Sequence, residues 1–152
     1  MLHRKPSDIS GFTLVELLIA IAILGILAGI ATLQFFSYLE RARIARAKSD
    51  IKVIEKAVVT FRISNGQWPA NLAEADADLK DPWGNPYRYQ PVPGTPKGKL
   101  RKDRFLVPIN SDFDLYSMGR DGKSQGPLTA NASQDDIIRA NNGGFVGLAS
   151  FY

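Results

Sequence analysis

The stretch "GFTLVELLIAIAILGILAGIATLQFF", from Gly11 to Phe36, decides the fold, because it is almost entirely apolar yet holds one carboxylate, Glu16, near its start. From Phe12 to about Phe36 it supplies the roughly 20 residues that a helix needs to cross the hydrocarbon core of a bilayer. A secretory signal would end after a shorter apolar region at a small-residue cleavage site. No such site follows here, so we expect a membrane anchor rather than a removed signal.

One long helix is predicted from Thr13 to Ser64, because no proline interrupts this part of the chain. Beyond the apolar run, apolar residues recur at spacings of four and three, which predicts a single buried face of an amphipathic helix. These residues are Ala47, Ile51, Ile54, Val58 and Phe61. Asn65-Gly66 predicts a left-handed cap that ends the helix. The second half of the helix must therefore pack on a folded domain.

The rest of the chain predicts a small domain of short strands and tight turns. Strand patterns occur at residues 87–89, at 104–109 ("RFLVPI") and at 113–118 ("FDLYSM"), and an irregular tail is expected after the turn at 119–122. Trp68 and Trp83 are expected to be packing residues. We predict an α+β fold in which a long N-terminal helix, transmembrane in its first half, packs on a small antiparallel β-sheet.

Composition and charge narrow the classes of function that the protein can have. The chain of 152 residues has no cysteine, which excludes a disulfide framework and a thiolate metal site. Its net charge is +4, and the basic excess lies between Glu40 and Arg62, beside the apolar run. This placement predicts contact with anionic lipid headgroups, and nucleic-acid binding is the less favoured alternative. The single histidine, His3, precedes the apolar run, and no catalytic set of nucleophile, base and orienting residue is found, so we predict no enzymatic activity.

The opening stretch resembles the prepilin-type signature of type IV pilins and type II secretion pseudopilins. The signature is a short basic leader, then Gly11, Phe12-Thr13-Leu14, Glu16 and an apolar run. The resemblance implies that a prepilin peptidase cuts between Gly11 and Phe12 on the cytoplasmic side and methylates the new amino group of Phe12. It also implies four segments, which are a leader (1–11), a filament-core helix (12–36), an amphipathic helix (37–64) and a periplasmic β domain with a C-terminal loop (65–152).

The same resemblance gives Glu16 a partner. A charge at the centre of a bilayer costs about 2.5–3.5 kcal/mol on insertion scales, and less near the end of a helix. Cleavage would create a cationic amine on Phe12, which in a filament can meet Glu16 of a neighbouring subunit at low dielectric, where the attraction is strong. Phe12 and Glu16 are therefore the predicted assembly residues. Filament relatives commonly carry a proline where this chain has Leu33, so whether the helix melts on assembly stays open.

The tail, with "DPWGNPYRY" and "DLYSMGRDG", resembles the major pseudopilin family of type II secretion. In that family a strand, a turn and a following acidic residue surround a calcium ion, which accepts six to eight oxygen ligands. The resemblance implies Asp121 as the main carboxylate, Asp135 and Asp136 as weaker candidates, and backbone carbonyls near Leu115 and Ser117 as further ligands. The alternative is that Asp121-Gly122 forms an ordinary turn and that the acidic pair caps a helix.

The resemblance implies a structural subunit of a type II secretion pseudopilus, which drives the export of folded proteins. Its expected partners are further copies of itself in a helical filament, minor pseudopilins, prepilin peptidase, the inner-membrane assembly platform and the lipid bilayer. The expected location is the bacterial inner membrane, crossed once, with the domain in the periplasm. One alternative is a type IV pilin for adhesion, motility or DNA uptake, many of which carry a C-terminal disulfide. Another is a solitary membrane-anchored binding domain that never polymerises.

Overall fold

The computed structural model describes residues 11–152 of the chain. The predicted leader, apart from Gly11, lies outside these described residues. The chain divides into two compact units, residues 1–40 and residues 41–152, which are described separately. The long helix α1 (Leu14–Asn65) contributes to both of them. This helix confirms the prediction made from the absence of proline.

The N-terminal unit consists of the first part of α1. Its large apolar side chains are exposed, including Leu17, Ile23 and Leu27, each more than half accessible. The helix has a mean hydropathy of 2.7 over its most apolar window of 18 residues, and none of that window is buried. By length and composition, it is long and apolar enough to cross a membrane. The exposed side chains therefore need either lipid or other helices around them.

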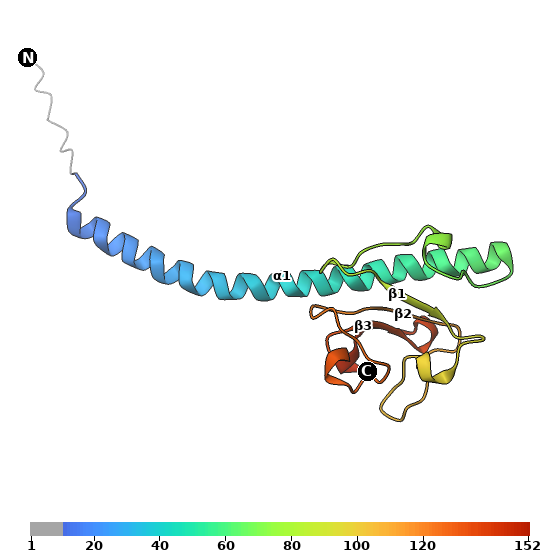
Figure 1. Ribbon diagram of the computed structural model, residues 1–152. Coiled ribbons are helices and arrows are strands. Elements are labelled where there is room, and N and C mark those ends of the chain that lie inside the picture. The colour runs from blue at the N-terminus through green and yellow to red at the C-terminus, as the bar shows by residue number, and fades with distance from the viewer. Residues whose placement is uncertain (1–10) are drawn as a thin grey trace, which may run out of the picture. The chain divides into compact units, whose positions relative to one another are not determined.

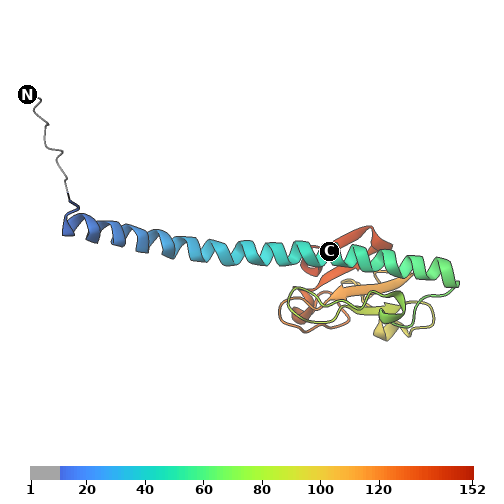
Figure 2. The same ribbon diagram turned by 90° about the horizontal axis from the view of Figure 1, so that it is seen from above.

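The C-terminal unit places the second part of α1 against a four-stranded antiparallel sheet (Figures 1 and 2). The strands are β1 (Arg88–Pro91), β2 (Phe113–Ser117), β3 (Ile137–Ala140) and β4 (Phe145–Leu148). They are hydrogen-bonded in the order β1-β2-β3-β4, so each strand pairs with its neighbour in sequence. Five short 3₁₀ helices lie in the connections, η1 (Ala73–Ala75), η2 (Lys97–Lys99), η3 (Asn131–Ser133), η4 (Asn141–Gly143) and η5 (Ala149–Phe151). The α+β prediction is confirmed.

The core lies between α1 and the sheet. Ala47, Ile51, Ile54 and Val58 are completely buried and pack in one cluster with apolar residues of β2 and β3. Each fully buried aliphatic side chain contributes about 1.5–3 kcal/mol relative to exposure. Because side chains alternate along a strand, Ile137 faces this cluster while Ile138 belongs to a second, smaller cluster. The amphipathic face predicted from the sequence thus packs on the sheet.

The end of α1 and the packing of both tryptophans are as predicted from the sequence. The helix stops at Asn65, and Gly66 follows with φ +74°, a conformation that glycine adopts without a steric penalty. Trp68 and Trp83 both pack against the main core, and the Trp68 ring lies 5.2 Å from the ring of Phe113. The last residue of the predicted buried face, Phe61, is an exception because it stays partly exposed.

Two expectations for the strands are wrong. The segment 104–109 is a tight loop rather than a strand, because the Asp103 Oδ1 atom accepts hydrogen bonds from the backbone amides of Phe105 and Val107 and holds the chain in a turn. The tail expected to be irregular contains β3 and β4, which extend the sheet beyond β2. All four residues of β3 are buried. The sequence did not predict this burial, because β3 is a short apolar run that contains a charged arginine.

That arginine, Arg139, joins α1 to the sheet from a buried position, with 2% of its side chain exposed. Its Nε lies 2.7 Å from an oxygen of Glu55 on α1, and its Nη2 lies 2.6 Å from an oxygen of Asp112 ahead of β2. It also donates to the backbone carbonyl of Phe113 and lies 4.0 Å from the centre of that ring. The buried cation is therefore paired on two sides, as its desolvation requires.

Candidate functional site

The first candidate site is the start of α1. Thr13 is the residue before the helix, and its Oγ1 accepts a hydrogen bond from the backbone amide of Glu16 at 3.2 Å. In return, the Oε2 atom of Glu16 accepts from the backbone amide of Thr13 at 2.9 Å and from its hydroxyl at 2.8 Å. This reciprocal arrangement is a capping box, which satisfies backbone amides that the first turn leaves unpaired. The spacing Thr13-x-x-Glu16 could have revealed it from the sequence.

The capping box also determines which oxygen of the Glu16 carboxylate can accept a further hydrogen bond. Both bonds from Thr13 end on Oε2, and within the described residues Oε1 accepts none. Glu16 is exposed, and so is Phe12, with 83% of its surface accessible. The carboxylate is thus held at the end of an apolar helix with one oxygen available to a donor from outside the subunit. Gly11, Phe12 and Glu16 lie at the sequence positions predicted for processing and assembly.

The second candidate site is the loop after β2. Here Gly119 has φ +63° and its Cα lies against Asp135, so that a Cβ atom added to Gly119 would come within 2.3 Å of the Asp135 carbonyl oxygen. The Asp135 carboxylate accepts from the backbone amide of Asp121 at 3.1 Å, and the Asp121 carboxylate accepts from the amide of Lys123 at 2.7 Å. The structure therefore brings Asp121 and Asp135 together.

Asp136 lies in a different environment. It is completely buried, and its Oδ2 atom accepts from Arg101 and, at 2.6 Å, from the hydroxyl of Ser124. Arg101 is itself 3% exposed, donates to Ser124 and to the Gln125 carbonyl, and lies over the ring of Tyr116. The guanidinium thus supplies the positive charge that Asp136 needs in a buried position. Sequence reasoning missed Arg101, because nothing in its local sequence sets it apart from the basic residues around it.

The side chains as they stand do not fit the calcium site that the resemblance implies. Asp136 is held by Arg101, and the hydroxyl of Ser117 donates to Asp81 at 2.6 Å. Leu115 lies in β2, where it is paired with Tyr89 of β1. Over residues 11–152, no group of three or more His, Cys, Asp or Glu side chains is placed to hold a metal ion. Arg101 and Ser124 both bind Oδ2 of Asp136, whereas its Oδ1 is buried and has no hydrogen-bond partner within the described residues, so only Oδ1 is available to an ion.

Calcium binding therefore stays a prediction from the resemblance. Thermal unfolding in calcium and in chelator tests it directly. A higher melting temperature in calcium, abolished by Asp121→Asn, would support an ion at Asp121 and Asp135. Identical unfolding curves in the two conditions would contradict calcium binding.

The contact between Gly119 and Asp135 predicts a large effect of Gly119→Ala. The methyl group would clash with the backbone of Asp135 and would also force a left-handed conformation on alanine. We expect a loss of about 2–5 kcal/mol, the sum of about 1–2 for the conformation and about 1–3 for overpacking. Gly94→Ala is the matched control, since Gly94 also has a positive φ (+81°) but open space around it. Equal losses in the two variants, measured by chemical unfolding, would contradict this contact.

Burial of Asp136 predicts a pH dependence of stability. Desolvation raises the pKa of Asp136 to about 6, although Ser124 and Arg101 both favour its charged form. The folded chain then keeps a proton that the unfolded chain has released. Its contribution to stability is therefore complete below about pH 4 and is lost as the pH rises through about 6. The loss amounts to at most about 3 kcal/mol, at 1.36 kcal/mol for each unit of pKa shift.

The variant Asp136→Asn cannot titrate, so its free energy of unfolding should fall less than that of the wild type between pH 4 and pH 7. The measurement is the difference between the two pH values for each protein, which cancels the constant cost of the substitution. The same fall in both proteins would show that Asp136 does not titrate in this range.

Comparison with known proteins agrees with the geometry of the N-terminal site. Residues 7–32 match the prokaryotic N-terminal methylation motif, which covers Gly11, Phe12, Thr13 and Glu16. The chain is thus a member of the class of proteins that carry this N-terminal signature ahead of an apolar helix.

The remainder of the chain identifies the family within that class. Residues 34–137 match the family of type II secretion system protein G. A type II secretion system core protein G from Pseudomonas aeruginosa is 37% identical over 127 residues, which cover 77% of this chain and 87% of the relative. That from Dickeya chrysanthemi is 32% identical over 138 residues, covering 88% and 87%. This chain therefore belongs to the type II secretion system protein G family, the major pseudopilins.

The similarity to pilins is more limited. A fimbrial protein from Neisseria meningitidis is 40% identical over 65 residues, but these cover 43% of this chain and 38% of the relative. No solved structure matches the chain significantly. The match to protein G extends through the C-terminal unit as far as residue 137, so the pilin alternative is not favoured.

Proposed function

We propose that the chain is the repeating structural subunit of a type II secretion pseudopilus. One observation carries the proposal, namely a carboxylate held by a capping box at the start of a helix whose apolar N-terminal part is not buried, in a chain of the protein G family. Prepilin peptidase cuts between Gly11 and Phe12 and methylates the Phe12 amine. The amine of one subunit then pairs with the free oxygen of Glu16 in its neighbour.

The remaining partners and the location follow from the same assignment. Before assembly, α1 crosses the inner membrane of the bacterium once, with the C-terminal unit in the periplasm. The inner-membrane assembly platform adds subunits to the filament, minor pseudopilins join it, and its growth moves folded proteins outward. The chain acts through assembly rather than through catalysis, and it has no nucleic-acid partner.

Deletion of the gene from its native bacterium tests this function. Folded substrates of the secretion system should accumulate in the periplasm, and the wild-type chain supplied from a plasmid should restore their release. Overproduction of the chain together with the secretion apparatus should yield filaments in which it is the repeating subunit. Normal secretion without the chain, or its presence in membranes as a monomer alone, would refute the proposal.

A further inference from the structure

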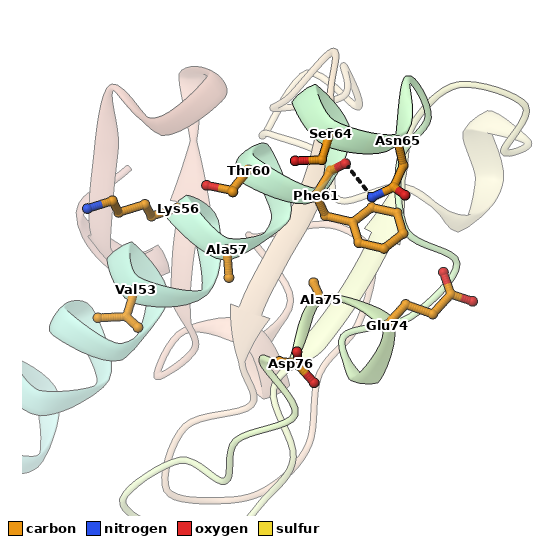
Figure 3. Close-up of a pocket in the computed structure, with 10 residues that line it drawn as sticks. All are labelled: Val53, Lys56, Ala57, Thr60, Phe61, Ser64, Asn65, Glu74, Ala75 and Asp76. Atoms are coloured by element: carbon orange, nitrogen blue, oxygen red, sulfur yellow. Dashed lines mark hydrogen bonds between the residues drawn. The ribbon is translucent and has the colours of Figure 1, made fainter.

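An open groove runs along the last turns of α1 in the C-terminal unit, and we call it the helix groove. It has a volume of about 510 Å³. Figure 3 shows side chains of α1 and of the segment around η1 lining it, which are Val53, Lys56, Ala57, Thr60, Phe61, Ser64, Asn65, Glu74, Ala75 and Asp76. Its floor is apolar, and Val53 is 58% exposed there. Phe61, the one residue of the predicted buried face that stays partly exposed, belongs to this floor.

One edge of the helix groove is acidic. Glu74 and Asp76 line this edge, and Asp78 follows outside the lining; all three are exposed, and no basic residue stands between them. Among residues 11–152, none of the three forms an ion pair. Lys56 lies on the α1 side of the groove and is its one basic lining residue. A ligand of this groove should therefore be apolar at its centre and basic at the side that meets η1.

The loop between η2 and β2 has these properties. Its tip exposes three consecutive apolar residues, Phe105, Leu106 and Val107, which are 70%, 63% and 54% accessible. Leu106 has φ +61°, a strained conformation for a residue with a Cβ atom, and Asp103 holds it there. A rigid, exposed apolar run of this kind is unfavourable in water and is typical of a surface that binds another protein. We call residues 104–107 the apolar tip.

Basic residues flank the apolar tip. Lys97, Lys99, Lys102 and Arg104 lie on it or just before it, and none forms an ion pair within the described part of the chain. The guanidinium of Arg104 lies 4.8 Å from the centre of the Phe105 ring, so that charge and apolar surface are presented together. The carboxylate of Asp103 is used internally by the loop. The tip thus combines an apolar centre with a positive edge, which complements the helix groove.

The two surfaces cannot meet within one subunit. Figures 1 and 2 show η2 and the yellow segment after it on the side of the sheet away from α1. We propose that the apolar tip of one subunit docks into the helix groove of a neighbouring copy. Such a contact joins two different patches, and a repeated contact of this kind builds an open helix when the rotation between copies does not close into a ring. The proposal rests on the filament function and assigns it a contact between the C-terminal units, separate from the pairing of Phe12 with Glu16.

Charge reversal tests this contact in the full chain, produced together with its secretion apparatus. Glu74→Lys with Asp76→Lys should lower the yield of filaments about tenfold or more, because like charges would face each other across the interface. Lys102→Glu with Arg104→Glu should do the same. The chain that carries all four changes should regain most of the wild-type yield. The amount of each variant in the membrane fraction controls for folding.

Cysteine cross-linking provides a second measurement, since the chain has no cysteine of its own. Thr60→Cys in the groove together with Leu106→Cys in the tip should give a ladder of disulfide-linked oligomers in assembled filaments. Lys123→Cys with Leu106→Cys is the matched control, because Lys123 is exposed but lines neither surface. This pair should give no ladder.

The outcomes separate this inference from the function itself. If the wild-type chain forms no filaments, the proposed function fails. If wild-type filaments form but charge reversal leaves their yield unchanged, or the four changes together restore nothing, the tip and groove are not partners and the inference is wrong. A ladder from the control pair but none from Thr60→Cys with Leu106→Cys would also overturn it.

Discussion

Glu16→Ala is expected to abolish filament assembly while leaving the chain inserted in the membrane and its leader removed. The carboxylate would no longer neutralise the Phe12 amine of the neighbouring subunit, which would then lie unpaired in an apolar environment. Leaving a buried charge without its partner costs about 3–5 kcal/mol per subunit. Since each 1.4 kcal/mol is about a factor of ten in an equilibrium constant, the yield of filaments should fall by about a hundredfold or more.

Thr13→Val is the matched control, because it removes the hydroxyl of the capping box but keeps the charge of Glu16. Loss of a cap costs about 1 kcal/mol, so assembly should fall much less than in Glu16→Ala. The measurement is the amount of each chain in filaments sheared from cells, relative to the amount in membranes. A normal filament yield from Glu16→Ala would show that assembly does not depend on pairing of the Phe12 amine with Glu16.

Arg139→Met is expected to cause a large loss of stability in the C-terminal unit. The substitution keeps an unbranched side chain of similar length but removes a buried cation that contacts Glu55, Asp112 and the carbonyl of Phe113. Removal of one partner from a buried pair costs about 3–5 kcal/mol. Glu55 and Asp112 each keep about a fifth of their side chains exposed (22% and 21%), so water can compensate in part. We therefore expect about 3 kcal/mol.

Urea unfolding of the detergent-solubilised chain, followed by the fluorescence of Trp68 and Trp83, measures this loss. The midpoint should fall while the slope stays constant, which indicates a change in stability rather than in the unfolded state. Arg120→Met is the control, because Arg120 is exposed and should change stability by less than about 0.5 kcal/mol. Similar midpoints for both variants would show that the contacts of Arg139 between α1 and the sheet contribute little to stability.

The long helix, with its apolar first half and its amphipathic second half, could be predicted from the sequence because the signals for both halves are local. The apolar run, the spacing of Ala47 to Val58 and the Asn65-Gly66 stop each depend on neighbours within one or two helical turns. The same is true of the N-terminal signature, where Gly11, Phe12 and Glu16 lie within six residues. Strands at residues 87–89 and 113–118 were also expected, and β1 and β2 lie there.

What the sequence could not predict depends on contacts between distant residues. The buried charge in β3 is tolerated because Arg139 pairs with Glu55, which lies 84 residues earlier, and such a partner leaves no local trace. Arg101 pairs with Asp136 across 35 residues in the same way. The segment 104–109 has the composition of a strand, but Asp103 closes it into a loop and exposes its apolar side chains.

The pairing of a freed N-terminal amine with Glu16 is tested most directly by mass spectrometry of the chain isolated from its filaments. We predict that the N-terminal peptide begins at Phe12, with one methyl group on its amine, and that residues 1–11 are absent. A filament subunit that still begins at Met1 would have no amine at Phe12 to pair with the carboxylate, and this result would contradict the account.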